Sequence, residues 1–250
     1  MKKTFEDFLN ETNQFLGWDF SFITETDRMT SEPLSWSYGS MAYSLLPCVK
    51  VMLDMGTGGG EFLSKLRPLP IQTYATEGYE PNVSLAINRL EPLGVKVLPI
   101  ESDEELPFEN QFFDLILNKH ESYSPKGIRR VMKRDGIFLT QQVGGQDCIE
   151  INNALGAPIN SEYEKWNLQT ALAELKESGF KILSSKEEYP YQRFYDLGSL
   201  IYYLNAIPWQ VEKFNVDDFR ENLLKLYNLI EKEGYFDVRQ HRFYIKAIAI

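Results

Sequence analysis

The chain has 250 residues and a hydrophobic content of 43%, which excludes a disordered protein and allows one large domain or two small ones. Its two cysteines, Cys48 and Cys148, are too few for a disulfide framework and lie in no metal-binding motif, so we expect a reduced, cytoplasmic setting and no bound metal. The net charge of −10 argues against a nucleic-acid partner, although a local basic groove stays compatible with one. No apolar run has the length of a membrane span, and the first residues, MKKTFEDFLNETNQ, lack the pattern of a signal peptide, so we expect no membrane partner.

The first 47 residues predict a helical and aromatic cover. Residues 4–16 place their apolar side chains on one stripe of a helix, with Thr4 as a candidate N-cap. Residues 17–48 are rich in aromatic and turn-forming residues and end in a predicted short helix near 39–46. We expect this segment to be a packed but irregular entry to the domain that follows.

From residue 49 onward, predicted strands and helices alternate. Short apolar runs predict strands at 49–54, 71–76, 95–100, 112–118 and 136–142, and helical patterns between them cover 61–67, 81–91 and 125–133. This order predicts a parallel sheet with helices on both faces. The basic run Arg129, Arg130, Lys133 and Arg134 falls at the end of the last of these helices, where the helix dipole favours cations, and it predicts a solvated helix face rather than a nucleic-acid site.

The last hundred residues have a different pattern. Residues 167–178 predict a helix that stops at Gly179, and residues 180–188 and 239–250 predict two strands. The roughly fifty residues between these strands are too many for a structureless loop. Helical periodicity at 193–206 and 217–233 instead predicts a helical insertion at about 190–236.

The stretch VMLDMGTGGGEF, residues 51–62, is the most informative motif. A predicted strand delivers Asp54 to its carboxyl end, and four of the five positions from 56 to 60 are glycine. Glycines let the backbone turn sharply and approach a ligand closely, and the helix that follows presents its positive end to an anionic group. Glu61 stands where the dinucleotide fingerprint requires glycine, and no Lys-Ser/Thr pair follows, so the loop is not a nucleoside-triphosphate loop either. The alternative is a glycine-rich turn without a ligand.

A second acid, Glu77, lies 23 residues after Asp54, at the end of the next predicted strand. An acid at this place can accept two hydrogen bonds from a ribose diol. The alternative is an ordinary acid at a strand end, and the preceding glycine loop makes the ribose-binding interpretation the better one.

The sequence resembles the class I S-adenosylmethionine-dependent methyltransferases. The resemblance rests on VMLDMGTGGGEF, TYATEGYEPN and ESDEELPFENQFFDLILNKHE, and it covers residues 48–188 and the last strand; LTQQVGG at 139–145 resembles a small, type 11-like subgroup. It implies a Rossmann-like, doubly wound α/β fold with seven strands, mostly parallel, of which the last is antiparallel and forms a hairpin with the sixth. It also implies S-adenosylmethionine as the cofactor.

The resemblance assigns cofactor contacts to individual residues. The methionine part of the cofactor is implied to lie against the loop residues Asp54, Gly56, Thr57, Gly58 and Gly60. Glu77 is implied to hold the ribose, and Gly78 and Asn118 are also implied to contact the cofactor. Ser102 or Asp103 is implied to reach the adenine, with Glu104 as the alternative one residue away, although the five acids within 101–109 could also form a solvated loop.

The predicted strand FFDLILN ends in Asn118, and the family places the cofactor and the acceptor at this strand end. The following NKHESY differs from the Asn/Asp-Pro-Pro-aromatic clamp of methyltransferases that act on base amino groups, which argues against a nucleobase acceptor. His120 is a candidate general base because an imidazole titrates near working pH, and Glu121 is a candidate residue to orient it. The alternatives are a hydrogen-bonded turn histidine and a solvated acid.

The sequence also allows predictions for three further polar residues, His241, Gln141 and Gln142. His241, the only other histidine, lies in a predicted terminal strand away from the cleft, so we expect a structural role. Gln141 and Gln142 alternate along one strand, so we expect one of the two to face the substrate.

We therefore predict a methyltransferase domain at 48–250, with the cover at 1–47 and the insertion as additions to it. Both additions are rich in aromatic residues and are suited to a lid, although the aromatics could also be the cores of two small subdomains. Methyl transfer needs mainly alignment and exclusion of water, so we expect catalysis by proximity on a small-molecule acceptor. The alternatives are an RNA or protein methyltransferase, a cofactor-binding protein without transfer activity, and a nicotinamide enzyme.

Overall fold

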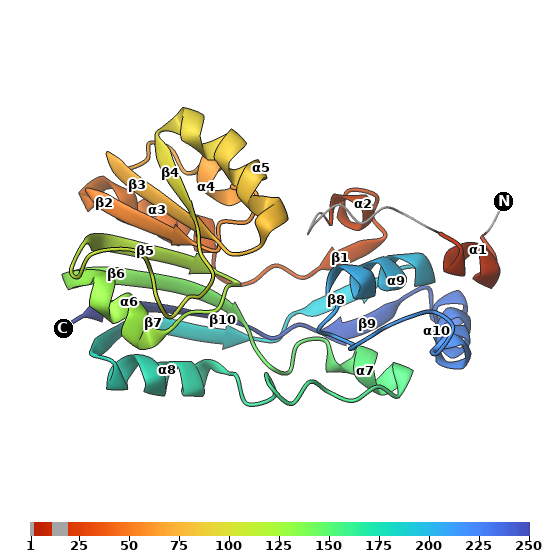
Figure 1. Cartoon of the computed structure of the whole chain (residues 1–250). Helices are drawn as coiled ribbons and strands as arrows, with labels where there is room; N and C mark the ends of the chain where they lie inside the picture. Colours follow the sequence, from red (N-terminus) through yellow and green to blue (C-terminus); the bar gives the residue numbers. More distant parts are fainter. Residues whose placement is uncertain (1–2, 12–19) are drawn as a thin grey trace. The chain divides into compact units, whose positions relative to one another are not determined.

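The computed structural model of the chain describes residues 3–11 and 20–250, and their contacts form two compact units (Figure 1). The larger unit comprises Ser35–Val143, Trp166–Glu187 and Arg242–Ile250. The smaller unit comprises the chain up to Leu34 together with Gly144–Lys165 and Glu188–His241. The domain boundaries predicted above, at residue 47 and around the insertion, stay predictions.

The larger unit is built on a sheet of seven strands in the order β4-β3-β2-β5-β6-β10-β7. Its strands are β2 (Val51–Met55), β3 (Gln72–Glu77), β4 (Val95–Pro99), β5 (Phe113–Lys119), β6 (Met132–Val143), β7 (Phe180–Glu188) and β10 (Arg242–Ala249). The first five strands in the spatial order pair in parallel, and β10 pairs antiparallel with β6. The predicted seven-stranded, mostly parallel sheet with an antiparallel last strand is confirmed.

Helices cover both faces of this sheet. They are α3 (Tyr38–Leu45), α4 (Glu61–Lys65), α5 (Glu80–Leu90), α6 (Pro125–Val131) and α8 (Leu168–Glu177), with short 3₁₀ turns at Leu46–Cys48 and Glu91–Leu93. The helices α6 and α8 contribute to one hydrophobic cluster, and α3, α4 and α5 contribute to another. Along β2, Leu53 and Met55 belong to the first cluster and Met52 to the second, because successive side chains of a strand point to opposite faces.

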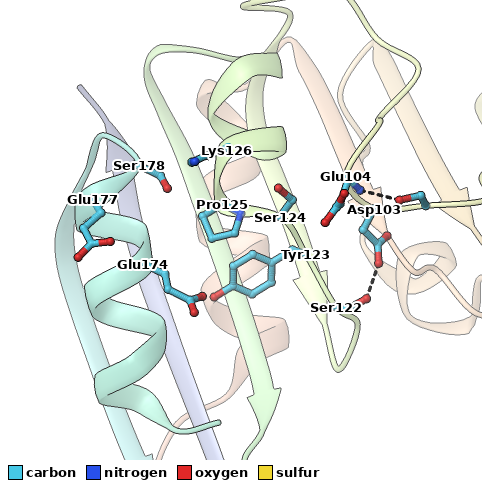
Figure 2. A pocket seen from close by; sticks show the side chains of 11 residues that line it. Asp103, Glu104, Ser122, Tyr123, Ser124, Pro125, Lys126, Glu174, Glu177 and Ser178 are labelled. Atoms are coloured by element: carbon cyan, nitrogen blue, oxygen red, sulfur yellow. Dashed lines mark hydrogen bonds between the residues drawn. The ribbon is translucent and has the colours of Figure 1, made fainter. Parts of the chain in front are cut away.

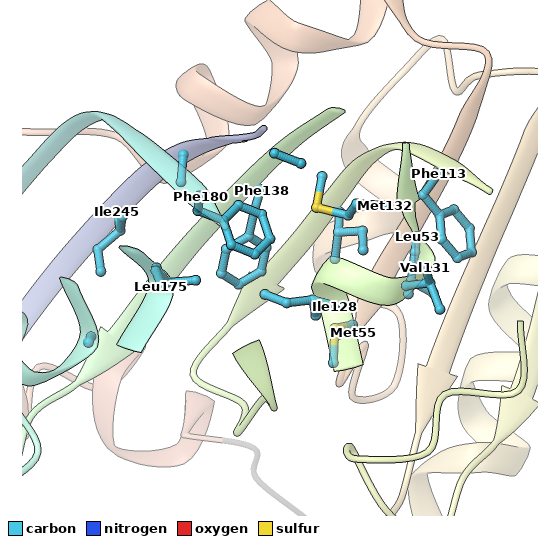
Figure 3. Packing of buried hydrophobic residues seen from close by; sticks show 14 of the residues in the cluster. Leu53, Met55, Phe113, Ile128, Val131, Met132, Phe138, Leu175, Phe180 and Ile245 are labelled. Atoms are coloured by element: carbon cyan, nitrogen blue, oxygen red, sulfur yellow. The ribbon is translucent and has the colours of Figure 1, made fainter. Parts of the chain in front are cut away.

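The first of these clusters is centred on aromatic side chains (Figure 3). Phe138 of β6 is fully buried, and its ring centroid lies 5.1 Å from that of Tyr123 and 6.2 Å from that of Phe180. Contacts of this kind join β6 to β7 and to the loop after β5. The cluster therefore holds the strand ends in a fixed relation to one another.

Residues of the basic run after residue 128 make contacts that hold the neighbouring backbone. The Arg130 guanidinium donates to the carbonyl oxygens of Leu106 and Phe108, at 2.6 and 2.7 Å. Lys133 forms an ion pair with Asp114 at 2.7 Å. Arg130 and Arg134 are exposed, as expected of a solvated face, but Lys133 and Arg134 belong to β6 and not to the predicted helix.

The smaller unit has a three-stranded sheet of its own. The order is β1-β8-β9, with β1 at Met29–Ser31, β8 at Tyr191–Phe194 and β9 at Phe236–Arg239, and both pairings are antiparallel. Its helices are α1 (Phe5–Leu9), α2 (Ser21–Thr24), α7 (Ile149–Leu155), α9 (Leu197–Ala206) and α10 (Arg220–Glu233). The two helices predicted within 190–236 are present, but the segment also contains β8 and the start of β9. These strands were not predicted because strands of four residues are too short to show a clear sequence period.

At the N-terminus, the Thr4 hydroxyl accepts the N–H of Asp7 and caps α1, as predicted. The helix predicted at 4–16 is observed at Phe5–Leu9 and ends at its C-cap Asn10, so it is shorter than predicted. Residues 12–16 of the predicted helix, and the aromatic Trp18, lie outside the described residues.

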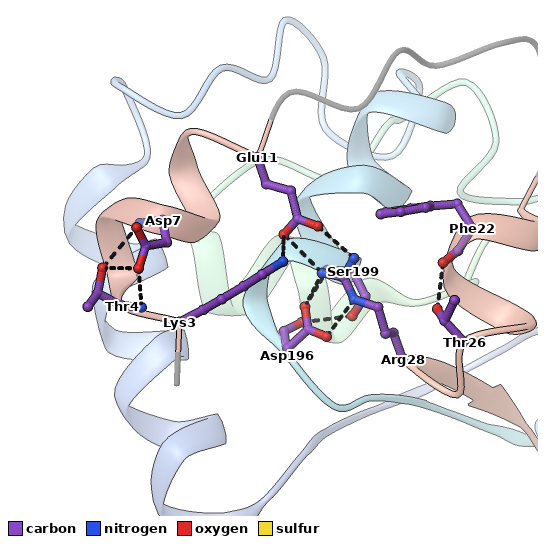
Figure 4. Close-up of polar contacts among 9 residues, drawn as sticks. All are labelled: Lys3, Thr4, Asp7, Glu11, Phe22, Thr26, Arg28, Asp196 and Ser199. Carbon is purple, nitrogen blue, oxygen red and sulfur yellow. Dashed lines mark hydrogen bonds and ion pairs between the residues drawn. The ribbon is translucent and has the colours of Figure 1, made fainter. Parts of the chain in front are cut away.

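A charged cluster joins the segments of the smaller unit (Figure 4). The Arg28 guanidinium binds the Asp196 carboxylate at 2.6 and 2.7 Å and the Glu11 carboxylate at 2.8 and 3.1 Å. Asp196 also accepts the N–H of Ser199 and so caps α9. One planar guanidinium thus holds two carboxylates from distant segments, a geometry that arginine favours over lysine.

His241 lies between β9 and β10 and has a structural environment. It is 1% exposed, its N–H donates to Asp147 at 2.7 Å, and its ring stacks on Tyr189 with centroids 4.6 Å apart. Its Nδ1 accepts the N–H of Gln146. These contacts support the structural role expected for this histidine.

The replacement Phe138→Ala should destabilise the larger unit. It removes a fully buried ring and leaves a cavity, which costs about 3–5 kcal/mol of unfolding free energy. Urea denaturation monitored by circular dichroism measures this loss. The control is Leu183→Ala on β7, where the side chain is 47% exposed and the loss should stay below about 1 kcal/mol.

Candidate active site

The candidate site lies at the edge of the larger sheet where the parallel strands end. Asp54 is near the end of β2, Glu77 ends β3, and Asn118 is near the end of β5. Strand β10 runs the other way, so its first residue, Arg242, pairs with Val143 at the end of β6 and lies at the same edge. Ligands of open α/β sheets bind at this edge.

Glu77 connects the glycine loop to the strand beside it. One carboxylate oxygen accepts the N–H of Gly58 at 2.7 Å, and the other accepts the N–H of Tyr79 at 2.8 Å. The side chain is 2% exposed, and burial raises the pKa of this carboxyl. A buried acid with two backbone donors has a defined orientation, which a ribose-binding residue requires.

Gly58 is where the loop faces open space. Its φ is +61°, a left-handed conformation that favours glycine, and a Cβ on this residue would meet no atom within 4 Å. The turn is held by Thr57, whose N–H donates to the carbonyl of Thr76 at 3.0 Å. The open space beside Gly58 and the adjoining Glu77 carboxylate fit a ligand with a ribose.

The other predicted loop glycines serve close packing. A Cβ on Gly60 would lie 2.7 Å from Leu90, and a Cβ on Gly56 would collide with the Glu121 side chain. A Cβ on Gly78 would lie 3.4 Å from the carbonyl oxygen of Ile100. Gly56 and Gly60 therefore let other parts of the chain approach, whereas Gly58 leaves room for a ligand.

Three carboxyl groups beside the loop have raised pKa values. Burial raises the pKa of Asp54 to about 7, and the cation of Lys119 opposes this rise. Burial, followed by the charges of Asp103 and Glu77, raises the pKa of Glu121 to about 7. The pKa of Asp103 is raised by burial as well. The surroundings of the glycine loop, from the end of β2 to the loops after β4 and β5, are thus a concentrated acidic environment.

The three candidates for the adenine contact lie in the loop after β4 and differ in burial and in hydrogen bonding. Asp103 is partly buried and accepts a hydrogen bond from Ser122, which brings it toward the end of β5. Ser102 and Glu104 are exposed, and the Ser102 hydroxyl accepts the N–H of Glu104. Of the three, Asp103 is the one directed toward the other site residues.

A cavity of about 650 Å³ opens beside this loop (Figure 2). Asp103 and Ser122 line one side of it, and Lys126 and Glu174 line the other; Ser102 is also among the lining residues. It includes neither Glu77 nor any residue of the glycine loop. The cavity therefore borders the region expected for the adenine and does not outline the whole site.

Asn118 is fully buried, and its polar atoms pair within the protein. Its side-chain oxygen accepts from Thr140 at 2.8 Å and from Gln142 at 2.6 Å, and its Nδ2 donates to the carbonyl of Ser122. The Tyr38 hydroxyl accepts the N–H of Asn118 at 3.0 Å. The side chain predicted to contact the cofactor is therefore engaged in holding the loop that follows β5.

His120 is in a strained backbone conformation next to Asn118. Its φ is +61°, and its N–H donates to the carbonyl of Gln141 at 2.8 Å. The side chain is exposed, and its Nε2 lies 2.9 Å from Nε2 of Gln141. Gln141, and not Glu121, contacts the imidazole. Although this residue has accessible surface, the protein packed densely around the ring, followed by the cations of Arg242 and Lys119, holds the pKa of His120 well below its usual range.

Several of these contacts depend on residues that the sequence did not single out for the site. Trp36 donates its indole N–H to Gln141, and Tyr38 lies between β5 and β6. Gln141 and Gln142, of which one was expected to face the substrate, are both buried, Gln142 against Asn118 and Gln141 against His120. The signal available was the aromatic richness of 17–48, which does not specify a partner.

Comparison with known proteins identifies the class. Residues 53–140 match a family model described as a methyltransferase domain, and this region contains the glycine loop, Glu77, Asp103 and His120. This part of the chain is thus similar to methyltransferase domains. The match supports a methyltransferase of class I with S-adenosylmethionine as its cofactor.

Solved structures share the fold at low sequence identity. A Bacillus halodurans protein described as a candidate methyltransferase is 16% identical with a TM-score of 0.61, covering 83% of this chain and 96% of its own. A Thiobacillus denitrificans S-adenosylmethionine-dependent methyltransferase, in complex with S-adenosylhomocysteine, is 15% identical with a TM-score of 0.50, covering 92% and 98%. The [4+2]-cyclase SpnF is 15% identical with a TM-score of 0.55, covering 84% and 80%. No curated protein sequence matches the chain.

The replacement Glu77→Gln should weaken the binding of S-adenosylhomocysteine about 10- to 100-fold. It places an amide NH₂ against one of two backbone donors and removes the charge that would pair with the ribose. The expected loss of binding free energy is ~1.5–3 kcal/mol. Titration calorimetry measures the change. Glu80→Gln, an exposed acid three residues away, is the matched control and should bind normally. Normal binding by Glu77→Gln would place the ribose elsewhere.

The pKa of Glu121 predicts a pH-dependent stability. With a folded pKa of about 7 and an unfolded value near 4.3, this carboxyl keeps its proton in the folded state while the unfolded chain releases it. Its contribution therefore lowers the unfolding free energy as pH rises through the window from about 4 to 7. Glu121→Gln cannot titrate, so its stability relative to the native protein should be higher at pH 7.5 than at pH 4.5 in urea denaturation. A constant difference across this range would contradict the assignment.

Proposed function

We propose that this protein transfers the methyl group of S-adenosylmethionine to a small-molecule acceptor at the edge formed by β2, β3 and β5. The observation that carries the proposal is the Glu77 carboxylate, which is buried, held by Gly58 and Tyr79, and placed beside open space. This arrangement falls within the residues that match the methyltransferase family model.

The residues suggest a division of roles. Glu77 would hold the ribose hydroxyls, the loop from Asp54 to Gly60 would lie against the methionine part, and Asp103 would face the adenine. Bound S-adenosylmethionine supplies a methyl group on a sulfonium, which needs alignment with the acceptor more than it needs acid–base help. Asn118 would keep the loop after β5 in place, so that the acceptor is aligned and water excluded.

Two observations favour a small acceptor over a nucleic acid. The protein carries a net charge of −10, and the basic run after residue 128 is engaged with Leu106, Phe108 and Asp114. A lid formed by the N-terminal cover and the insertion stays a prediction from sequence. Within the described part of the chain, every helix is too short or too polar to cross a bilayer. The cytoplasmic setting is proposed from the cysteine content alone.

Binding and transfer can be tested separately. S-Adenosylmethionine and S-adenosylhomocysteine should each bind in the micromolar range, about 7–8 kcal/mol, in titration calorimetry, and NAD should not bind. A metabolite screen with a labelled methyl donor should then find transfer to a small molecule, while bulk RNA and protein stay unlabelled.

Cofactor binding without label transfer to any metabolite would favour the rival function, a cofactor-binding protein with another reaction. The cyclase SpnF shows that this fold is not confined to proteins named as methyltransferases.

A further inference from the structure

The protonation of His120 follows from its hydrogen-bond partners. The Trp36 indole N–H lies 2.8 Å from Oε1 of Gln141, and an indole nitrogen can only donate. The amide oxygen of Gln141 must therefore face Trp36, so its NH₂ faces His120. Since that NH₂ is a donor 2.9 Å from Nε2 of His120, Nε2 must be the acceptor. The imidazole is then neutral, with its proton on Nδ1.

This tautomer changes what His120 can do for a substrate. Its one lone pair is already used by Gln141, so the ring is poorly placed to act as a general base. Nδ1–H has no partner among residues 3–11 and 20–250, and the side chain is exposed. The ring therefore presents a donor to whatever lies above the end of β5.

Two cations lie at the same place. Lys119 precedes His120 at the end of β5, with its ammonium 5.5 Å from the centroid of Phe62. Arg242 opens β10 opposite Val143, and its charge acts on both Lys119 and His120. The acidic groups Asp54, Glu77 and Asp103 belong to β2, β3 and the loop after β4. Glu121 follows His120 in sequence, but its side chain lies against Gly56 of the glycine loop. The edge is thus acidic on the side of the glycine loop and basic on the side of β5 and β10.

We propose that His120, through Nδ1–H, and the cations of Lys119 and Arg242 form a subsite for an anionic group, so that the methyl acceptor carries a carboxylate or a phosphate. In this arrangement Trp36 and Gln141 are positioning residues, because they act only by fixing the tautomer and orientation of the ring. The inference rests on the proposed function, since it names the acceptor class of the same site.

The tautomer can be measured directly because the chain has only two histidines. Long-range ¹H–¹⁵N correlation spectra at pH 7 should show His120 neutral with its proton on Nδ1. Trp36→Phe removes the donor that orients Gln141, so it should give a mixture of the two neutral tautomers. A native His120 that is protonated on Nε2, or is an imidazolium at pH 7, overturns the proposal.

The anion site can be measured in the same spectra with sodium acetate and inorganic phosphate as probes. At least one of these anions should shift the His120 signals saturably and leave those of His241 unchanged. Tighter binding of acetate would indicate a carboxylate acceptor, and tighter binding of phosphate would indicate a phosphate acceptor. Lys119→Met and, as a second variant, Arg242→Gln should each weaken this response at least fivefold. Lys65→Met removes an equal charge from the exposed end of α4 and should respond like the native protein.

Absence of a saturable shift with both anions, or an equal shift with tetramethylammonium, overturns the anion subsite. These measurements need no methyl transfer, so they are independent of the proposed function. Failure of S-adenosylhomocysteine to bind in calorimetry overturns the proposed function even where the anions bind. Normal cofactor binding without an anion response overturns only the subsite.

Discussion

The Glu77 carboxylate is the interaction on which the site depends. It accepts backbone N–H groups from Gly58 and from Tyr79, so one buried acid determines how the glycine loop after β2 lies against the end of β3. Burying a carboxylate is costly unless donors compensate it. The loop supplies one donor from Gly58, which is in a left-handed conformation, and Tyr79 after β3 supplies the other. The conformation of the loop and the orientation of the acid therefore stabilise each other.

A second network organises the other half of the sheet edge. Asn118, Thr140, Gln142 and Tyr38 pair with one another between β5 and β6, and nearly all of their polar atoms are buried. Such a network is rigid because a change in any member leaves a buried polar group unpaired. It holds the end of β5 in place directly before the strained His120. It also explains why Asn118, which was expected to contact a ligand, is directed into the protein.

Much of the fold was predictable because it depends on local patterns. The short apolar runs from Val51 to Val143 are strands that alternate with amphipathic helices, and this order determines a parallel sheet. The glycine loop and Glu77 were recognisable for a similar reason, since a sharp turn after a strand needs glycine whatever surrounds it. Strands β1, β8 and β9 escaped prediction because each is stable only through its pairing with a distant segment.

The sequence by itself determined the alternating architecture, the acids at the strand ends and the family to which they point. Only the tertiary structure decided what His120 contacts, because its partner Gln141 lies 21 residues away in sequence and the Trp36 that orients Gln141 precedes that glutamine by 105 residues. A side chain's tautomer and charge depend on donors, acceptors and cations within a few ångströms. Those neighbours come from separate strands, so no local pattern of residues could specify them.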